Sequence, residues 1–75
     1  MGMGIGLTEW VITTRSNKKF YNKRNGAFMR DVTEQCLFPS YDKAKAQLDQ
    51  MDFGYVIKPA KVYRDIAQTK IRLTS

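Results

Sequence analysis

The sequence predicts an α+β fold, in which a small, mostly antiparallel sheet of three to five short strands carries one helix on one face. Three observations support this prediction. Runs of β-branched and aromatic residues recur along the chain, Asn25-Gly26 is a strong turn signal, and one central segment has its apolar residues at helical spacing. With 75 residues the chain forms one domain, which needs either a nearly ideal core or a second copy, so a homodimer is left open.

The first predicted strand covers residues 9–15, a segment rich in β-branched and aromatic side chains. Because side chains alternate along a strand, Trp10 and Ile12 share one face, and Val11 and Thr13 share the other.

A hairpin and a third strand are predicted to follow. The polar residues 16–18 indicate a turn, after which residues 19–22 pair back on the first strand. Asn25 and Gly26 both tolerate a positive φ, so the chain is expected to reverse again there. Residues 27–30 then form a short third strand.

The helix is predicted over residues 41–51, after a segment at 35–38 that reads either as a helical turn or as a short strand. Ser40 is placed as the N-cap, and Asp42 lies in the first turn, where a negative charge favours the helix dipole. The apolar residues at spacings of three and four form one buried stripe: Tyr41, Ala44, Leu48 and Met51.

Two further strands are predicted after the helix, over residues 53–58 and 60–66, with Gly54 supplying a left-handed residue near the helix end. Pro59 lacks an N–H and is expected to interrupt the pairing between them. The last strand places Val62, Arg64 and Ile66 on one side and Lys61, Tyr63 and Asp65 on the other.

The domain is thus expected at residues 9–66. Residues 1–8, with three glycines among the first six, are predicted to be a flexible leader. The polar tail at 67–75 is expected either to extend the last strand or to stay loose.

The order of these motifs resembles that of small, uncharacterised bacteriophage proteins of ββαβ type. The resemblance spans residues 9–66 and rests on Trp-Val-Ile, a basic linker, Phe-Tyr, Asn-Gly, Cys-Leu-Phe-Pro-Ser-Tyr-Asp-Lys-Ala and Tyr-Val-Ile. It implies that Phe38, Ser40 and Ala44 seat the helix on the sheet. It implies no catalytic residue.

Composition argues against enzyme chemistry. The chain has no histidine and one cysteine, so the common general base, the usual zinc ligand sets and an internal disulfide are all excluded. Cys36, next to Leu37 and Phe38, is predicted to be a core residue. We expect no catalytic residue, no metal and no cofactor. No stretch is long and apolar enough to span a membrane, and a cytoplasmic location is predicted, which for a phage protein is the host cytoplasm.

Charge is unevenly distributed. The formal net charge is +6, with net charges of +5 over residues 1–30, −3 over 31–57 and +4 over 58–75. Between Arg15 and Arg30 lie six cations, no carboxylate and three aromatic rings. Cations can contact phosphates or acidic surfaces, and exposed rings can stack on bases or anchor a protein contact.

Three interpretations of this segment are open. It binds an acidic protein surface of a host factor, or it binds nucleic acid, or it only keeps the domain in solution. If the first and last strands are neighbours, the cations of both ends are expected to merge into one positive surface. The candidate binding residues are Arg15, Lys18, Lys19, Tyr21, Lys23, Arg24, Arg30, Lys61, Tyr63 and Arg64.

Overall fold

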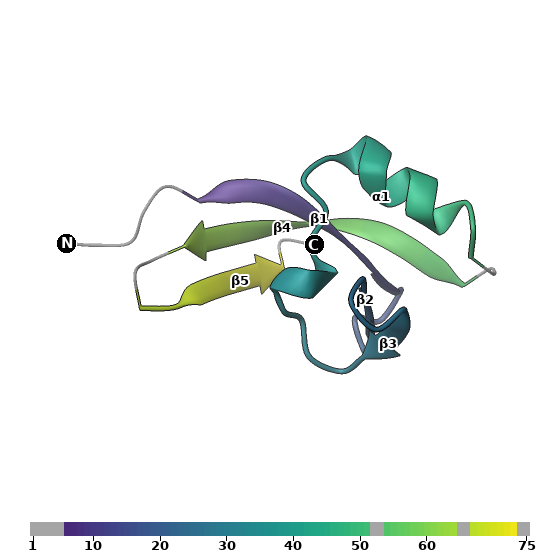
Figure 1. The fold of residues 1–75 in the computed structure, drawn as a ribbon, viewed down its shortest axis with the longest axis horizontal. Helices are drawn as coiled ribbons and strands as arrows, with labels where there is room; N and C mark the ends of the chain where they lie inside the picture. The colour runs from purple at the N-terminus through teal and green to yellow at the C-terminus, as the bar shows by residue number, and fades with distance from the viewer. Residues whose placement is uncertain (1–5, 52–53, 65–66, 74–75) are drawn as a thin grey trace.

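The computed structural model describes residues 6–51, 54–64 and 67–73. One five-stranded antiparallel sheet, in the order β3-β2-β1-β4-β5, packs against one helix (Figure 1), which confirms the predicted α+β class. The elements are β1 (Leu7–Thr14), β2 (Phe20–Asn22), β3 (Ala27–Met29), the 3-10 helix η1 (Glu34–Cys36), α1 (Tyr41–Leu48), β4 (Tyr55–Arg64) and β5 (Thr69–Leu73).

Strand β1 forms the centre of the sheet. It pairs along its whole length with β4, from Leu7 opposite Val62 to Thr14 opposite Tyr55. Its other edge pairs with β2 at one end, and further along it exchanges two backbone hydrogen bonds, of 2.9 and 2.8 Å, between Trp10 and Phe38. The predicted 35–38 segment therefore combines a helical turn with a strand-like bridge.

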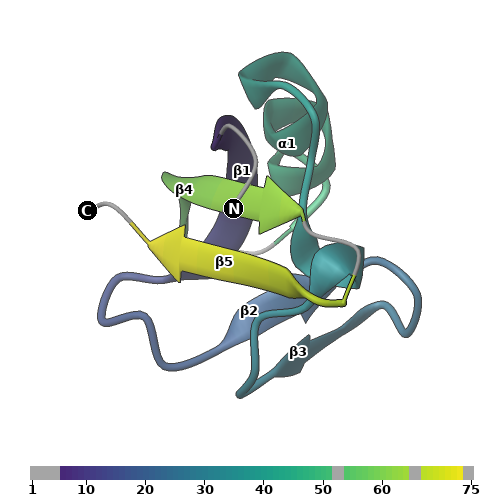
Figure 2. The same cartoon turned by 90° about the vertical axis from the view of Figure 1, so that its left-hand side faces the viewer.

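The sheet is covered on both faces, and its single α-helix lies on one of them, as predicted. On one face α1 packs over a core of Ile12, Phe38 and Ala44, with Leu48, Met51 and other half-buried side chains around it. On the other face the curved sheet encloses η1 (Figure 2) around Val11, Phe20, Cys36, Leu37 and Val62. Val11 and Ile12 are both fully buried although they point to opposite faces.

The predicted break at Pro59 is wrong, because β4 runs through this residue without interruption. Pro59 lies opposite Trp10, whose N–H and C=O both point away from β4 and bond to Phe38. The pairing with β1 therefore requires no N–H at position 59. On the other edge of β4, the described part of β5 ends opposite Ala60, so proline fits inside this strand.

The prediction for the tail was also wrong. Residues 69–73 neither extend β4 nor stay loose; they fold back as β5. Ile71 pairs with Val62, and Leu73 pairs with Ala60, which places both apolar side chains against the core on the η1 side. Burial of Ile71 and Leu73 is the physical reason for the reversal. The leader residues 1–5 lie outside the described residues, and β1 begins at Leu7, two residues before the predicted strand.

Local signals at the helix are largely confirmed. The Ser40 hydroxyl accepts a hydrogen bond of 3.2 Å from the Lys43 N–H, as expected of an N-cap. The helix ends at Leu48, earlier than predicted, since Met51 N–H bonds to the Leu48 carbonyl in a tighter, 3-10 type turn. Ala44 is fully buried, whereas Tyr41 is 46% exposed and touches Trp10 edge-on.

Candidate functional site

The β2–β3 hairpin and the residues directly beside it carry half of the sequence-predicted binding residues: Lys19, Tyr21, Lys23, Arg24 and Arg30. Its loop is held by Asn22, a buried residue whose side-chain oxygen accepts hydrogen bonds of 2.9 Å from Arg24 N–H and 3.2 Å from Asn25 N–H. Gly26 adopts a φ of 66°, while Asn25 keeps a negative φ, so only one of the two predicted residues supplies the left-handed conformation. This loop presents Arg24 to solvent.

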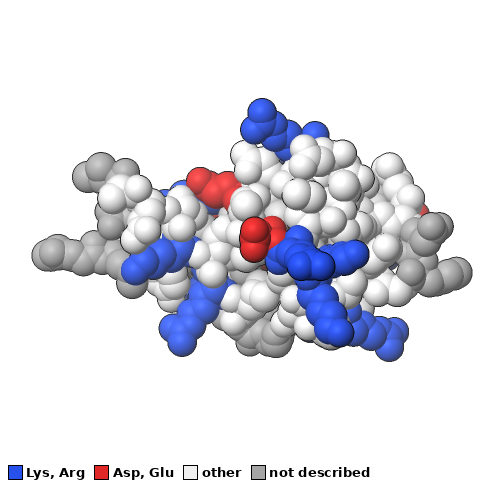
Figure 3. Space-filling model, turned by 90° about the horizontal axis from the view of Figure 1, so that it is seen from below, with Lys and Arg blue, Asp and Glu red and all other residues white. Residues whose placement is uncertain are grey.

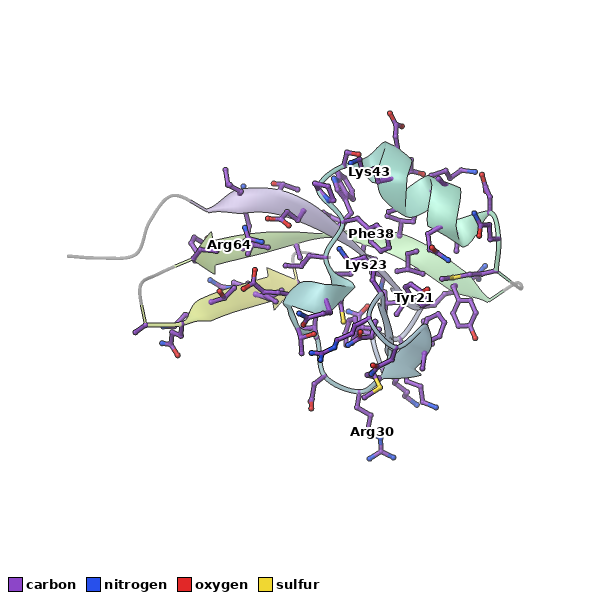
Figure 4. The ribbon with its side chains drawn as sticks, in the orientation of Figure 1. Tyr21, Lys23, Arg30, Phe38, Lys43 and Arg64 are labelled. Atoms are coloured by element: carbon purple, nitrogen blue, oxygen red, sulfur yellow. The ribbon has the colours of Figure 1, made fainter. Side chains whose placement is uncertain are left out.

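The backbone fixes Lys19 at the beginning of the hairpin. Its carbonyl accepts a 2.7 Å hydrogen bond from the Thr13 hydroxyl and a 3.2 Å bond from Thr14 N–H. Phe20 pairs with Met29, so Lys19 and Arg30 lie next to this pair, just outside the two strands. Both cationic side chains are exposed, and Arg30 points away from the sheet (Figure 4).

Lys19 and Arg30 line an open groove of about 480 Å³ at the edge strand β3. Its apolar lining comes from half-buried Phe28 and from Met29, which is 41% exposed. The groove is completed by polar and acidic side chains: Asn22, Asp31 and Thr33. We call this feature the hairpin groove.

A second open space, of about 320 Å³, lies between the hairpin and the end of α1. Three rings meet there: Phe28 stacks on Tyr55 with centroids 4.1 Å apart, and Tyr21 meets Phe28 edge-on at 5.6 Å. These rings are packed against each other on the helix side of the sheet. Tyr21 is consequently half-buried, as a core-rim residue is.

Three of the described lysines have polar contacts within the domain, and one of them, Lys45, pairs with Asp49 at 2.9 Å. The Lys23 ammonium donates a hydrogen bond to the Leu37 carbonyl and lies 5.0 Å from the centroid of the Phe38 ring (Figure 4). Lys58 donates to the Arg15 carbonyl at 2.9 Å and to the Asn17 side chain at 2.8 Å. Among the predicted binding residues, Lys23, Arg15, Lys18 and Arg24 are all exposed, but the ammonium group of Lys23 is bonded within the domain.

Arg64 is engaged as well, by two carboxylates. It forms ion pairs with Glu9 at 2.5 Å and with Glu34 at 3.0 Å, and the Thr69 hydroxyl donates to Glu34 at 3.1 Å. The hydrogen bonds from Arg64 and Thr69 lower the pKa of Glu34, and the same ion pairs raise the pKa of Arg64. The charge of Arg64 is therefore compensated within the domain.

The cations do not merge into one surface, although β1 and β4 are neighbours. On the face seen in Figure 3, Lys and Arg side chains lie in separate groups with acidic side chains between them. The register separates the predicted cations as well, because Lys61 lies on the opposite face of β4 from Arg64, which is paired with Glu9 and Glu34. Lys61 and Tyr63 are half-buried and are paired with two cations of β5, Arg72 and Lys70. The expectation of a single positive surface was wrong.

No protein family, curated protein or solved structure matches this chain. The site is therefore judged by its own geometry. Within residues 6–51, 54–64 and 67–73, no group of three or more metal-ligating side chains is placed to hold an ion. No helix in the same part of the chain is long and apolar enough to cross a membrane.

Sequence reasoning found the cations of the hairpin but missed the groove beside them. Phe28 and Met29 were placed only in the predicted strand at 27–30, and no sequence signal indicates that Met29 stays exposed at a sheet edge. Lys70 and Arg72 were also missed, since the strand that carries them was not predicted. What the hairpin offers is a surface for noncovalent contact: two flexible cations beside exposed apolar area.

Proposed function

We propose that this chain is a small, non-enzymatic binding protein that attaches to an acidic segment of a partner protein through its hairpin groove. The phage origin, the host setting of the partner and the cytoplasmic location rest on the sequence alone and stay predictions. The partner is expected to place an apolar side chain on Phe28 and Met29, with its carboxylates toward Lys19 and Arg30.

One observation carries this proposal: the groove combines exposed apolar surface with two cations on the edge strand of a sheet. A methionine that is 41% exposed adapts to different partner shapes because its side chain is unbranched and polarizable. Lys19 and Arg30 add electrostatic attraction, which raises the association rate and favours acidic partners. Asp31 also lines the groove, and its negative charge repels any partner carboxylate placed next to it.

A protein partner fits this surface better than a nucleic acid does. Binding of single strands relies on rings whose faces stack on bases. The two hairpin rings on this side, Tyr21 and Phe28, are instead packed within the domain. Phe28 stacks face to face on Tyr55 of β4 and meets Tyr21 edge-on. Lys23, which was expected to contact a partner, is bonded to Leu37 and lies over Phe38.

The test is affinity capture from nuclease-treated lysate, with three immobilised baits. The baits are the wild-type chain, the groove variant with Lys19→Ala and Arg30→Ala, and a control variant with Lys43→Ala and Lys45→Ala. Both variants lose two positive charges, but Lys43 lies on α1, at the other end of the view from Arg30 (Figure 4). A captured protein is then purified and titrated with each bait at several salt concentrations.

We expect a partner that survives nuclease, binds the wild type and the control equally, and binds the groove variant at least tenfold more weakly, the equivalent of about 1.4 kcal/mol. Met29→Ala should mainly speed dissociation, whereas loss of the two cations should mainly slow association. Capture that disappears with nuclease, or a partner that binds the groove variant as well as the control, contradicts the proposal.

A further inference from the structure

A second surface lies at the end of the sheet that α1 leaves uncovered. Tyr41, the first residue of α1, contacts Trp10, and Figure 1 shows the helix lying over only one end of the sheet. Since Trp10 pairs with Pro59, the β4 residues after Pro59 extend beyond the helix. On the helix-side face this end carries Thr8, Lys61, Tyr63, Lys70 and Arg72, which we call the platform.

The register places these five side chains on one face. Val62 is buried in the core on the η1 side, so its neighbours Lys61 and Tyr63 point to the opposite face. Directly paired residues of antiparallel strands share a face. Lys61 pairs with Thr8 on one side and Arg72 on the other, while Tyr63 pairs with Lys70.

Among the described residues, no acidic side chain pairs with the cations of the platform. Its described residues comprise three cations and no carboxylate, because Glu9, which neutralises Arg64, lies on the other face with Ala60 opposite. Lys61 and Arg72 form a direct cross-strand pair of like charges, an arrangement that destabilises a sheet. The stability of the fold therefore does not account for the pair, whereas an anionic ligand would.

Tyr63 supplies an aromatic ring in the middle of these cations. A Cβ atom added to Gly6 would lie 2.5 Å from one ring carbon of Tyr63, so the ring rests directly against the Gly6 backbone. Tyr63 is half-buried, while Lys70 and Arg72 beside it are exposed. The ring is thus held in position with part of its surface open.

We propose that the platform binds single-stranded nucleic acid, with backbone phosphates on Lys61, Lys70 and Arg72 and a base stacked on Tyr63. Cations that follow a backbone, together with a ring on an open sheet face, are the two elements that sequence-tolerant single-strand binding requires. An acidic polypeptide could use the cations but gains nothing from base stacking. This binding is independent of the proposed protein contact, because the platform and the hairpin groove share no residue.

The test is fluorescence anisotropy with labelled oligo(dT) and oligo(U) of about 15 nucleotides, a length within the range covered by small single-strand binders. A duplex of equal length and poly-glutamate are the competitors. The platform variant carries Lys70→Ala and Arg72→Ala, and the matched control again carries Lys43→Ala and Lys45→Ala. Tyr63→Phe and Tyr63→Leu separate stacking from mere apolar burial, and thermal melts confirm that each variant is folded.

For the wild type we expect a slope of log affinity against log salt of about −2, since each of three phosphate contacts on a single strand contributes about 0.7. The platform variant should flatten this slope to about −0.7. Tyr63→Leu should weaken binding by about tenfold, while Tyr63→Phe retains it. Gly6→Ala, which displaces the Tyr63 ring, should resemble Tyr63→Leu. The oligo(dT) and oligo(U) arms show whether DNA or RNA is preferred.

Four outcomes would overturn the proposal. They are absence of salt-sensitive binding, equal loss of affinity in the control variant, a duplex or poly-glutamate that competes as well as the single strand, and wild-type affinity in folded Tyr63→Leu protein. In the last case Lys70 and Arg72 act only as charges that protect an edge strand from pairing with other chains. The groove variant should bind oligonucleotide like the wild type, so failure of one proposal leaves the other unaffected.

Discussion

The two cores predict that two neighbouring residues of β1 both contribute strongly to stability, on opposite faces of the sheet. Val11 packs on the η1 side and Ile12 on the helix side, and both are 0% exposed. We expect Val11→Ala and Ile12→Ala each to destabilise the domain strongly. Leu7→Ala is the matched control, since Leu7 lies on the same strand but is 57% exposed.

The magnitude follows from the buried atoms. Ile12→Ala removes three carbons, about 2.4 kcal/mol at 0.8 kcal/mol per buried methylene, and a cavity term raises the expected loss to about 3–4 kcal/mol. Val11→Ala removes two carbons, so about 2–3 kcal/mol is expected. A chain of 75 residues has a typical free energy of unfolding of about 4–11 kcal/mol. Either substitution therefore removes a large part of the stability.

Urea unfolding followed by far-UV circular dichroism and by the fluorescence of Trp10, the only tryptophan, gives the free energy of unfolding of each variant. The m-value should stay near that of the wild type, while Leu7→Ala should fall within about 0.5 kcal/mol of it. If Val11→Ala were also within 0.5 kcal/mol of the wild type, the core around η1 would be refuted, and only the helix-side core would remain.

Three further predictions concern single side chains. Lys23→Met should destabilise the domain by about 1–2 kcal/mol, because it removes a hydrogen bond from a charged donor and a cation–π contact. The control Lys18→Met, at an exposed turn, should leave the free energy of unfolding nearly unchanged in the same urea assay. Glu34 has a lowered pKa in the folded state, so its stabilising effect is present above its ordinary value of 4.5 and is lost as the pH falls through the lower folded value. Thermal melts between about pH 6 and pH 3 should therefore show a fall in Tm that is shallower in Arg64→Gln; an identical fall in both proteins contradicts this role of Arg64. Cys36 is fully buried, and its sulfur lies 3.9 Å from the Asp31 carbonyl oxygen, so a thiol reagent should modify it slowly in native protein and rapidly in urea. The variant Cys36→Ala should retain oligonucleotide binding. Rapid labelling of the native chain would contradict the buried position.

Much of the local structure could be predicted because its signals lie within a few residues. Alternation identified β1, the Ser40 cap located the beginning of α1, and the apolar neighbours of Cys36 indicated a core position. Each of these features depends on the conformational preference of a short segment. The fold class followed from their order along the chain.

The candidate site was predictable only in part. The exposed cations of the hairpin were named from the sequence, yet the same reasoning treated Lys23 as free for binding. The structure shows that its neighbours are Leu37 and Phe38, 14 and 15 positions later, so its role depends on where the segment after β3 packs. Exposure of Met29 likewise depends on the position of β3 at the sheet edge.

The sequence by itself determined the fold class, the turns near Asn17 and Gly26, the capped helix and the strongly basic hairpin. Each of these features depends on the conformational preference or the charge of single residues and their near neighbours in the sequence. Only the tertiary structure decided that β4 continues through Pro59, that the tail returns as β5, and that Arg64 is neutralised by a glutamate 55 positions away. These outcomes depend on strand order and register, which are set by burial of apolar side chains contributed by distant segments. The same long-range pairing separates the cations into the hairpin group and the platform.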